Sequence, residues 1–352
     1  MSLAIADSQA ADDAEIPVID LAPFLAGAPG ALARTAAEVG RACEDVGFFT
    51  IVNHGIDAAV VERAFAAARA FFDLPHEAKM RIEVDRNQMG YIPIKTSVLR
   101  TSIINENTKA DLNETYVARR ERTADHPLVR EGRRMCGINR WPDELPEFRA
   151  ATLGYMDTME ALARRMLALY ATALGERPGH FDTSFADGNI ACRVSHYPRQ
   201  DAVEDNAFGL APHSDAGFIT LLPQAKVPGL EIRLPSGRWI AAPSRPGTIL
   251  VNSGETLARW TNDRYIATPH RVIPPRATDR ISLPFFYNPH PDAVVDCIAA
   301  CDTPAHPRKY APMTYGEYHI WYITQNYPRQ REAGDAEGAP PPGGISSQGA
   351  TP

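Results

Sequence analysis

The order of apolar and polar residues predicts helices mainly in the first half of the chain. An alanine-rich stretch over about 29–46 and a stretch over about 57–72 with apolar residues at helical spacing predict two helices. A long helix is predicted over about 145–174, because Gly175 stands where the C-cap of a helix is expected. One more helix is predicted near 314–327, so most of the predicted helix precedes residue 190.

Short apolar runs predict strands, which become frequent from residue 190 onward. Residues 16–21 have the pattern of an edge strand with a proline near its start, and 48–52 form a compact aromatic and β-branched strand. The stretch 82–140 is polar and irregular, and we expect residues 90–93 to form a loop. After residue 190, apolar runs recur every 8 to 12 residues between turn residues, as at 218–222, 230–233, 248–251 and 281–286. This spacing predicts an antiparallel sandwich or jelly roll.

The composition is that of a globular protein. Of the 352 residues, 44% are hydrophobic and 22% are charged, which excludes wholesale disorder. No run of 18 apolar residues occurs, so we expect no membrane-spanning helix. The formal net charge of −7 argues against a general nucleic-acid binder, which needs a basic surface. We therefore expect neither nucleic acid nor a membrane as a partner.

The cysteines and the N-terminus indicate a cytoplasmic protein. The five cysteines are scattered, odd in number and without CxxC spacing, so a disulfide scaffold or a zinc finger is not expected. The N-terminus lacks the positive start and apolar stretch of a secretory signal. A reducing cytoplasm is the expected location.

Three residues in the strand-rich half form a candidate metal site. His213 and Asp215 are two positions apart, so on a strand both side chains point to one face. His270 follows 55 residues after Asp215. Two imidazoles and one carboxylate are the facial triad of non-haem Fe(II) oxygenases, which leaves coordination positions open for substrate and O2. An HxD tripeptide alone also occurs by chance, and a single histidine is usually a packed or surface residue.

Arg280 and Ser282 form a candidate anion site ten residues after His270. In a strand these two side chains share a face. An inward arginine among apolar strands is costly unless it meets an anion, and its planar fork suits a carboxylate. The alternative is an arginine on the solvent side of an alternating strand.

The order of these motifs resembles the isopenicillin N synthase-like (iron/ascorbate-dependent oxidoreductase) family of Fe(II)/2-oxoglutarate-dependent dioxygenases. An HxD motif, a histidine about 55 residues later and an RxS motif ten residues beyond follow one another as in that family. The segments IPVIDL and GFFTIVNHGI are similar to its N-terminal region, and RVSHYP at 193–198 is similar to the strand that normally carries an Asn and a Tyr. The resemblance covers about residues 16–327.

The resemblance implies an α+β fold with a double-stranded β-helix (jelly-roll, cupin-like) core and flanking helices. It divides the chain into an N-terminal dioxygenase region and a jelly-roll core with its supporting helix, between a disordered lead-in and a disordered tail. The expected ranges are, in chain order, 1–15 for the lead-in, 16–140, 141–330, and 331–352 for the tail.

The resemblance also implies the roles of the site residues. Fe(II) would be bound by His213, Asp215 and His270, and the distal carboxylate of 2-oxoglutarate by Arg280, Ser282 and Tyr197. Two residues depart from the family pattern. Ser195 stands where an Asn is usual, which puts its contact to the co-substrate in doubt, and Glu255 replaces an Asp.

Other candidates in the resembling segments have weaker assignments. His54 is interpreted as part of a turn, and His196 as facing away from the iron. Asp111 and Glu114 are expected to organise a lid-like region rather than touch the substrate. The substrate cavity has aromatic candidates, for which packing in the core is the alternative: Tyr91, Phe286, Tyr318, Trp321 and Tyr322.

The implied activity is that of a 2-oxoglutarate-dependent dioxygenase that hydroxylates or desaturates a small molecule. Its cofactors would be Fe(II), 2-oxoglutarate and O2, with ascorbate as an auxiliary reductant, and 2-oxoglutarate would be decarboxylated to succinate and CO2. Three alternatives stay open. One is an isopenicillin N synthase-type oxidase that takes all four electrons from its substrate, another is an ethylene-forming enzyme, and the third is a binding module without catalysis.

Overall fold

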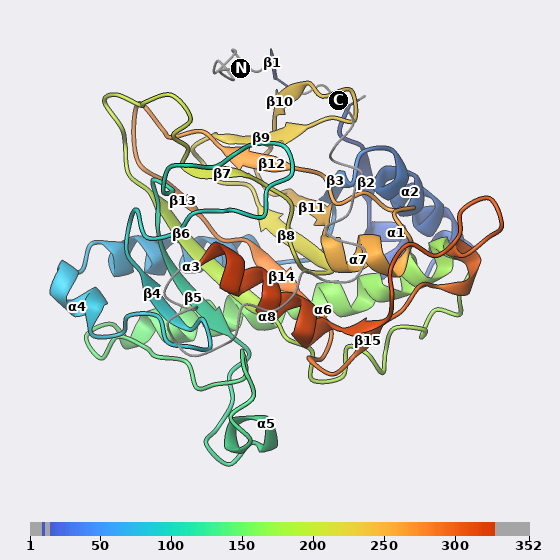
Figure 1. Ribbon diagram of the computed structural model, residues 1–352, viewed down its shortest axis with the longest axis horizontal. Helices are drawn as coiled ribbons and strands as arrows, with labels where there is room; N and C mark the ends of the chain where they lie inside the picture. Colours follow the sequence, from blue (N-terminus) through green and yellow to red (C-terminus); the bar gives the residue numbers. More distant parts are fainter. Residues whose placement is uncertain (1–8, 11–14, 328–352) are drawn as a thin grey trace.

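Two β-sheets form the centre of the molecule in this computed structural model, which describes residues 9–10 and 15–327 (Figure 1). The smaller sheet has the order β1 (Gln9–Ala10), β10 (Trp239–Ala241), β9 (Leu230–Arg233), β12 (His270–Val272) and β7 (Leu210–His213). The larger has the order β2 (Val18–Asp20), β3 (Phe48–Val52), β11 (Ile249–Ser253), β8 (Ile219–Pro223), β14 (Phe285–Tyr287), β6 (Ala191–Tyr197), β5 (Glu114–Arg119) and β4 (Gly90–Ile92). Strand β13 (Arg280–Ser282) also pairs with β6. This is the expected α+β fold with a double-stranded β-helix core.

The alternation of side chains on β3 shows how the layers are held together. Phe48 packs with Ile232 and Ile240 of the smaller sheet, so its side chain lies between the two sheets. Phe49, the next residue, belongs to the core that includes Phe71 and Met166 of the helices. Successive side chains of a strand point to opposite faces. The larger sheet therefore has one face toward the helices and one toward the smaller sheet.

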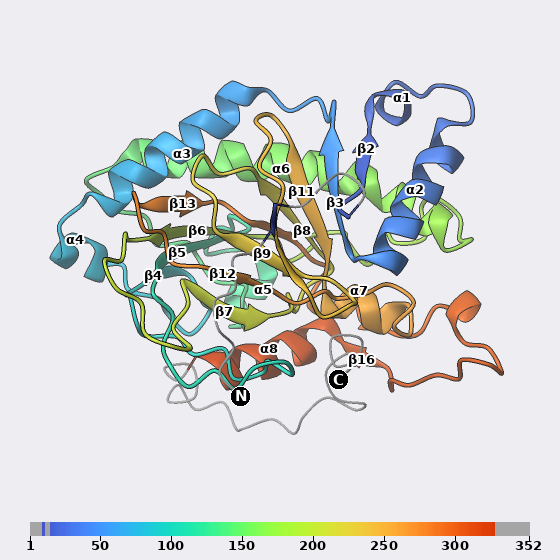
Figure 2. The ribbon, with the colours of Figure 1, turned by 90° about the horizontal axis from the view of Figure 1, so that it is seen from above.

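Helices cover both sides of this sandwich. Figure 2 shows α3 (Ala58–Phe72) and α6 (Pro146–Ala173) along one side and α8 (Tyr315–Asn326) on the other. The remaining helical segments are α1 (Ala22–Leu25), α2 (Ala31–Asp45), α4 (His76–Met80), α5 (Pro127–Arg130), α7 (Glu255–Trp260) and a 3-10 turn (Ala299–Cys301). A separate antiparallel pair consists of β15 (Val294–Val295) and β16 (Met313–Thr314), and β16 directly precedes α8 in the chain. Among the described helices, none combines the length and the apolar character needed to cross a membrane.

The long helices lie where the sequence predicts them, because their ends carry local signals. Helix α6 begins with Pro146, whose fixed φ suits the first turn, and Gly175 beyond its end adopts a left-handed φ of 79°. Helix α8 begins with a capping box between Thr314 and Glu317. Such signals depend on neighbouring residues only, so the sequence contains them in full.

The interpretation of 82–140 as irregular is wrong at three places, one of which is the short helix α5. Residues Gly90–Ile92 form β4 rather than a loop, and Glu114–Arg119 form β5, which pairs with β6 along its whole length. All six residues of β5 are buried, so the alternation that marks a half-exposed strand is missing from its sequence. Burial on both faces results from tertiary packing, and a local pattern does not contain it.

The apolar run 281–286 and the expected lead-in differ in part from the structure. The apolar run 281–286 is two strands, β13 and β14, that meet at Leu283 and Pro284. Of the expected disordered lead-in, Gln9–Ala10 form β1 beside β10, and the rest of residues 1–14 lies outside the described residues, as does the tail 331–352. Strands of both expected regions share the larger sheet, since β5 pairs with β6.

Candidate metal centre

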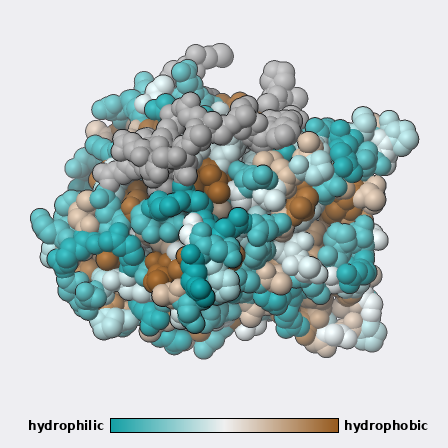
Figure 3. All heavy atoms as spheres, turned by 60° about the horizontal axis from the view of Figure 1, so that its bottom comes forward, coloured by the Kyte–Doolittle hydropathy of each residue, from teal (hydrophilic) through white to brown (hydrophobic). Residues whose placement is uncertain are grey.

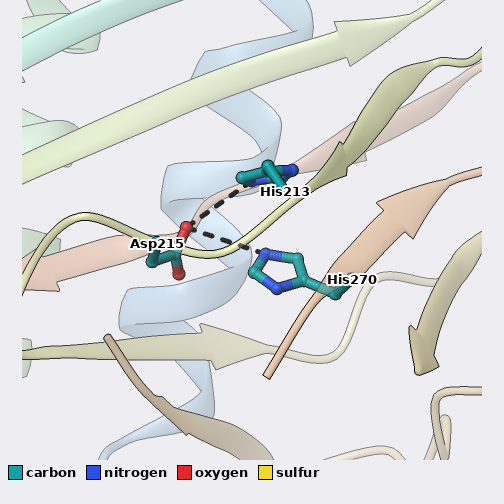
Figure 4. Close-up of side chains that lie close together, drawn as sticks. All are labelled: His213, Asp215 and His270. Carbon is teal, nitrogen blue, oxygen red and sulfur yellow. Dashed lines mark ion pairs between the residues drawn. The ribbon is translucent and has the colours of Figure 1, made fainter. Parts of the chain in front are cut away.

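The three candidate ligands lie together at the end of the smaller sheet. His213 ends β7 and His270 begins β12, and the two residues are paired across these antiparallel neighbours. The Nε2 atoms of both histidines lie 3.6 Å from Oδ1 of Asp215 (Figure 4). One donor atom from each residue fits within 4.8 Å of the others. The fold therefore brings residues 55 positions apart in sequence into one constellation, as the spacing predicts.

Neighbouring groups leave the three donor atoms free to bind a metal. Oδ2 of Asp215 accepts hydrogen bonds from the Thr220 hydroxyl at 2.5 Å and the Asn252 amide at 2.8 Å, which leaves Oδ1 facing the imidazoles. The Nδ1 atoms of His213 and His270 lie 2.8 and 3.2 Å from backbone oxygens. Such partners fix the tautomer and orientation of metal ligands. Thr220 and Asn252 were missed in the sequence, since only the strand pairing of β11 with β8 brings them to Asp215.

The protonation states of these groups also suit a metal ion. Burial would raise the pKa of Asp215, but His270, His213 and the Thr220 hydroxyl hold that pKa well below its usual range. Burial and the neighbouring His213 lower the pKa of His270 to about 4. A carboxylate and neutral imidazoles are the forms that coordinate metals. The donor set of two nitrogens and one oxygen fits Fe(II).

An open cavity of about 1110 Å³ joins the three ligands to the RxS strand. Strand β13 pairs with β6 so that Arg280 lies opposite Tyr197 and Ser282 opposite Ser195, and all four residues line the cavity. Ser195 thus occupies the cavity face at the position where the resembling family has an Asn.

Arg280 is buried with part of its donor capacity unused. Its Nε donates to the backbone oxygen of Val227 at 3.2 Å, and its guanidinium lies 5.1 Å from the centre of the Tyr197 ring. Nη1 is buried and has no hydrogen-bond partner in the described part of the chain. An unpaired buried guanidinium is costly, so this geometry suits an anionic ligand.

The structure separates the aromatic candidates for the substrate cavity. Phe286 and Tyr322 line it, and Tyr322 also lines a small adjoining pocket, where Tyr318 lies beside His213. Tyr91 does not line the cavity, so its assignment there is wrong: its hydroxyl donates to Glu114 at 2.5 Å and its ring packs in the core. Trp321 lines neither space.

The other candidates have structural contacts. His54 lies in the connection between β3 and α3, with Nε2 3.1 Å from the backbone oxygen of Gly247. His196 faces away from the metal site and contacts Glu114 at 2.7 Å. Asp111 accepts hydrogen bonds from the Ala211 amide and the Ser97 hydroxyl, and burial raises its pKa to about 6. None of His54, His196 and Asp111 lines the cavity.

Comparison with known families identifies the protein class. Residues 16–144 match the model described as non-haem dioxygenase in morphine synthesis N-terminal. Residues 189–289 match the model of the 2OG-Fe(II) oxygenase superfamily, and this range contains the three candidate ligands and the RxS strand.

The chain belongs to the 2OG-Fe(II) oxygenase superfamily. One relative of this oxygenase is the 2-oxoglutarate-Fe(II) type oxidoreductase hxnY of Emericella nidulans, which is 35% identical over 321 residues and is matched over 89% of this chain and 90% of its own. Another is a homoarginine-6-hydroxylase of Glycine max, which is 31% identical, with 90% of this chain and 99% of its own covered.

Solved structures agree with this assignment. A Neurospora crassa enzyme in complex with alpha-KG and thymine has a TM-score of 0.78 at 26% identity, covering 90% of this chain and 99% of its own. The dioxygenase for auxin oxidation of rice has a TM-score of 0.68 at 29% identity, covering 88% and 96%. The oxygenase is therefore an Fe(II)- and 2-oxoglutarate-dependent dioxygenase that uses O2.

Proposed function

We propose that His213, Asp215 and His270 hold the Fe(II) of this dioxygenase, and that Arg280, Ser282 and Tyr197 bind the distal carboxylate of 2-oxoglutarate. The observation that carries this assignment is the layout of one cavity. In this cavity, Oδ1 of Asp215 faces the imidazoles of His213 and His270. The RxS strand lines the same cavity and contributes the guanidinium of Arg280, whose buried Nη1 has no partner among the described residues. Iron bound at the triad supplies the activation of O2 that is coupled to decarboxylation of 2-oxoglutarate to succinate and CO2.

The residues of the chain orient a metal ligand, bind the co-substrate and enclose the substrate. Thr220 and Asn252 fix one oxygen of Asp215 so that the other points to the metal. Arg280 binds a carboxylate through its planar fork, and the ring of Tyr197 lies against the same guanidinium. The walls of the cavity then hold the substrate and exclude side reactions, which is the usual part that a protein plays beside a reactive centre.

The substrate is a small molecule that is hydroxylated or desaturated. The cavity is lined by apolar side chains with a few polar and charged groups among them, which is the usual character of a site for small ligands. Nucleic acid and membrane are not proposed as partners. The net charge is −7, and the face in Figure 3 carries hydrophobic residues in small groups among hydrophilic ones.

Spectroscopy and stoichiometry together test the proposed function. Anaerobic addition of 2-oxoglutarate to the Fe(II)-loaded protein should produce a charge-transfer absorption. Coupled turnover in the presence of ascorbate should release one succinate for each O2 consumed. Substrate oxidation at full rate without 2-oxoglutarate would contradict the proposal and favour an oxidase that takes all four electrons from its substrate.

Domain organisation and location are part of the same proposal. The ranges 16–140 and 141–330 remain the proposed N-terminal region and jelly-roll core. A reducing cytoplasm is the proposed location, supported by the five cysteines, all free in the structure. Cell fractionation with compartment markers tests the location, and recovery in a secreted or membrane fraction would contradict it.

A further inference from the structure

A second arginine, Arg193, lines the cavity away from the RxS strand. It lies on β6 two and four positions before Ser195 and Tyr197, and all three residues line the same cavity. Side chains two apart on a strand share a face. The guanidinium of Arg193 therefore belongs to the interior of the site and not to the outer surface.

The protein leaves most of the hydrogen-bonding capacity of Arg193 unused. Nη1 donates to the Tyr327 hydroxyl at 2.7 Å and Nη2 lies 3.4 Å from the Thr115 hydroxyl. The buried Nε has no partner in the described part of the chain. A guanidinium has five N–H donors, so these two neutral oxygens satisfy a minority of them.

Among the described residues, no carboxylate contacts Arg193 directly. Within the described residues, no aspartate or glutamate forms an ion pair with it. The carboxylate that acts on it electrostatically is that of Asp111, which instead accepts from the Ala211 amide and the Ser97 hydroxyl. A cation in a closed site is costly unless an anion meets it. A carboxylate of a ligand in the cavity would give Arg193 the direct anionic partner that the described residues do not supply.

The co-substrate does not account for this anion site. Arg280 lies opposite Tyr197 on the neighbouring strand, and Arg193 is four residues further along β6. Four residues of a strand correspond to about 13 Å between backbone positions. In the proposed function one carboxylate of 2-oxoglutarate binds the metal and the other binds Arg280, so neither is left for Arg193.

The surroundings of Arg193 add positive potential and apolar surface. Arg119 lies on β5 opposite Ala191 and lines the same cavity, and its Nε and Nη1 donate to the neutral oxygens of Asn87 and Asn189. Burial and the charge of Arg119 lower the pKa of the adjoining His319 to about 3. The other walls include the apolar side chains of Leu99, Leu210, Val272, Phe286 and Ile323.

We propose that Arg193 recognises a carboxylate of the primary substrate, so that the substrate class of this dioxygenase is a small carboxylic acid with an apolar body. This inference rests on the proposed function, because it takes the Arg280 end of the cavity as the co-substrate site. Arg193 binds the acid group, the apolar walls hold the body, and the body then lies toward the metal ligands.

Matched pairs of acids and amides test this role. The Fe(II)- and 2-oxoglutarate-loaded protein is titrated anaerobically with benzoate, phenylacetate and cyclohexanecarboxylate, and with the carboxamide of each. Binding is measured from the change in the charge-transfer absorption. In the wild type, acids should bind more tightly than their amides. Arg193→Gln should reduce this preference by roughly 30-fold or more, because a buried charge pair loses one partner.

Two variants serve as controls. Arg193→Lys retains the charge and should keep part of the preference, since an ammonium lacks the planar fork. Arg41→Gln removes the same charge from the exposed side of α2 and should behave as the wild type. If Arg193→Gln does not fold, Arg193→Lys carries the test alone.

The outcomes distinguish a failure of the proposed function from a failure of the role assigned to Arg193. A missing charge-transfer band before any probe is added contradicts the proposed function. With a normal band, the role of Arg193 is overturned if the wild type binds none of the acids, if it binds acids and amides alike, or if the glutamine variant keeps the wild-type preference.

Discussion

The two faces of the β5–β6 strand pair carry polar groups of opposite character. On the helix side, His196 lies opposite Glu114, and these two residues belong to a buried hydrogen-bonded network. On the cavity side, Arg193 of β6 and Arg280 of the adjacent strand β13 each keep a buried nitrogen without a partner in the described part of the chain. The same two strands thus carry a satisfied network on one face and unsatisfied donors on the other.

The network on the helix side is complete by itself. Glu114 accepts from the Lys79 ammonium at 2.9 Å and the Tyr91 hydroxyl at 2.5 Å, while His196 bridges Glu114 to Asp279. Every charge in it faces an opposite charge or a hydrogen-bonding group. Buried polar groups of this kind are structural, whereas an unpaired donor beside a cavity marks where a ligand completes the site.

The proposed metal ligands should give the largest effect. His213→Ala or Asp215→Ala should abolish turnover and Fe(II) binding, since two ligands are left where three held the ion. Iron content after gel filtration and calorimetric titration with Fe(II) measure this. His290→Ala serves as a control outside the cavity and should bind iron normally. Full iron-dependent activity in His270→Ala would show that the third ligand is another residue.

Arg280 should give the next largest effect, confined to the co-substrate. Arg280→Ala leaves the distal carboxylate without its partner, which typically costs about 2–5 kcal/mol, so the KM for 2-oxoglutarate should rise by roughly 30-fold or more. Arg280→Lys should recover only part of the loss. Ser282→Ala should cost less, on the order of 1–3 kcal/mol for a hydrogen bond to a charged group. An unchanged KM in Arg280→Ala would remove Arg280 from the co-substrate site.

Asn252 should have a smaller effect that acts through Asp215. Asn252→Ala removes one of the two donors that fix Oδ2 of Asp215. Loss of such a partner typically weakens metal affinity by about 10–100-fold. Calorimetric titration with Fe(II) should show this decrease, while the KM for 2-oxoglutarate at saturating iron stays near the wild-type value. A normal iron affinity would mean that Thr220 alone orients the carboxylate.

Glu114 should affect stability and its pH dependence, with little effect on ligand binding. Burial would raise its pKa, but hydrogen bonds from His196, Tyr91 and Lys79 lower it to about 2, from an ordinary value of 4.5. A folded pKa below the unfolded one stabilises the protein above pH 4.5, and this stabilisation is lost as the pH falls toward 2. The loss is on the order of 3 kcal/mol.

Denaturant unfolding at several pH values measures this contribution. Glu114→Gln should flatten the acid limb of the stability curve, whereas Glu62→Gln on the exposed side of α3 should leave it unchanged. A Glu114→Gln protein that folds yet binds 2-oxoglutarate at least 30-fold more weakly would contradict the division between the two faces.

Residue types and their spacing were enough to select the candidate metal ligands and the candidate anion site. The HxD motif, His270 and the RxS pair are defined by residue type and spacing, and they meet at one cavity because a strand puts alternate residues on one face. The long helices were likewise predictable, since their periodicity and their caps, such as Thr314 and Gly175, lie within a few residues of one another.

Only the tertiary structure decided which side chains meet in the cavity and which in the core. Tyr91 was assigned to the substrate site, yet it lies on the helix side, because β4 joins the larger sheet with that residue against Glu114. Asn252 reaches Asp215, and Arg193 the cavity, through strand pairings between residues far apart in the chain. A strand buried on both faces carries no local signal of which face is which, so packing alone settles the role of its residues.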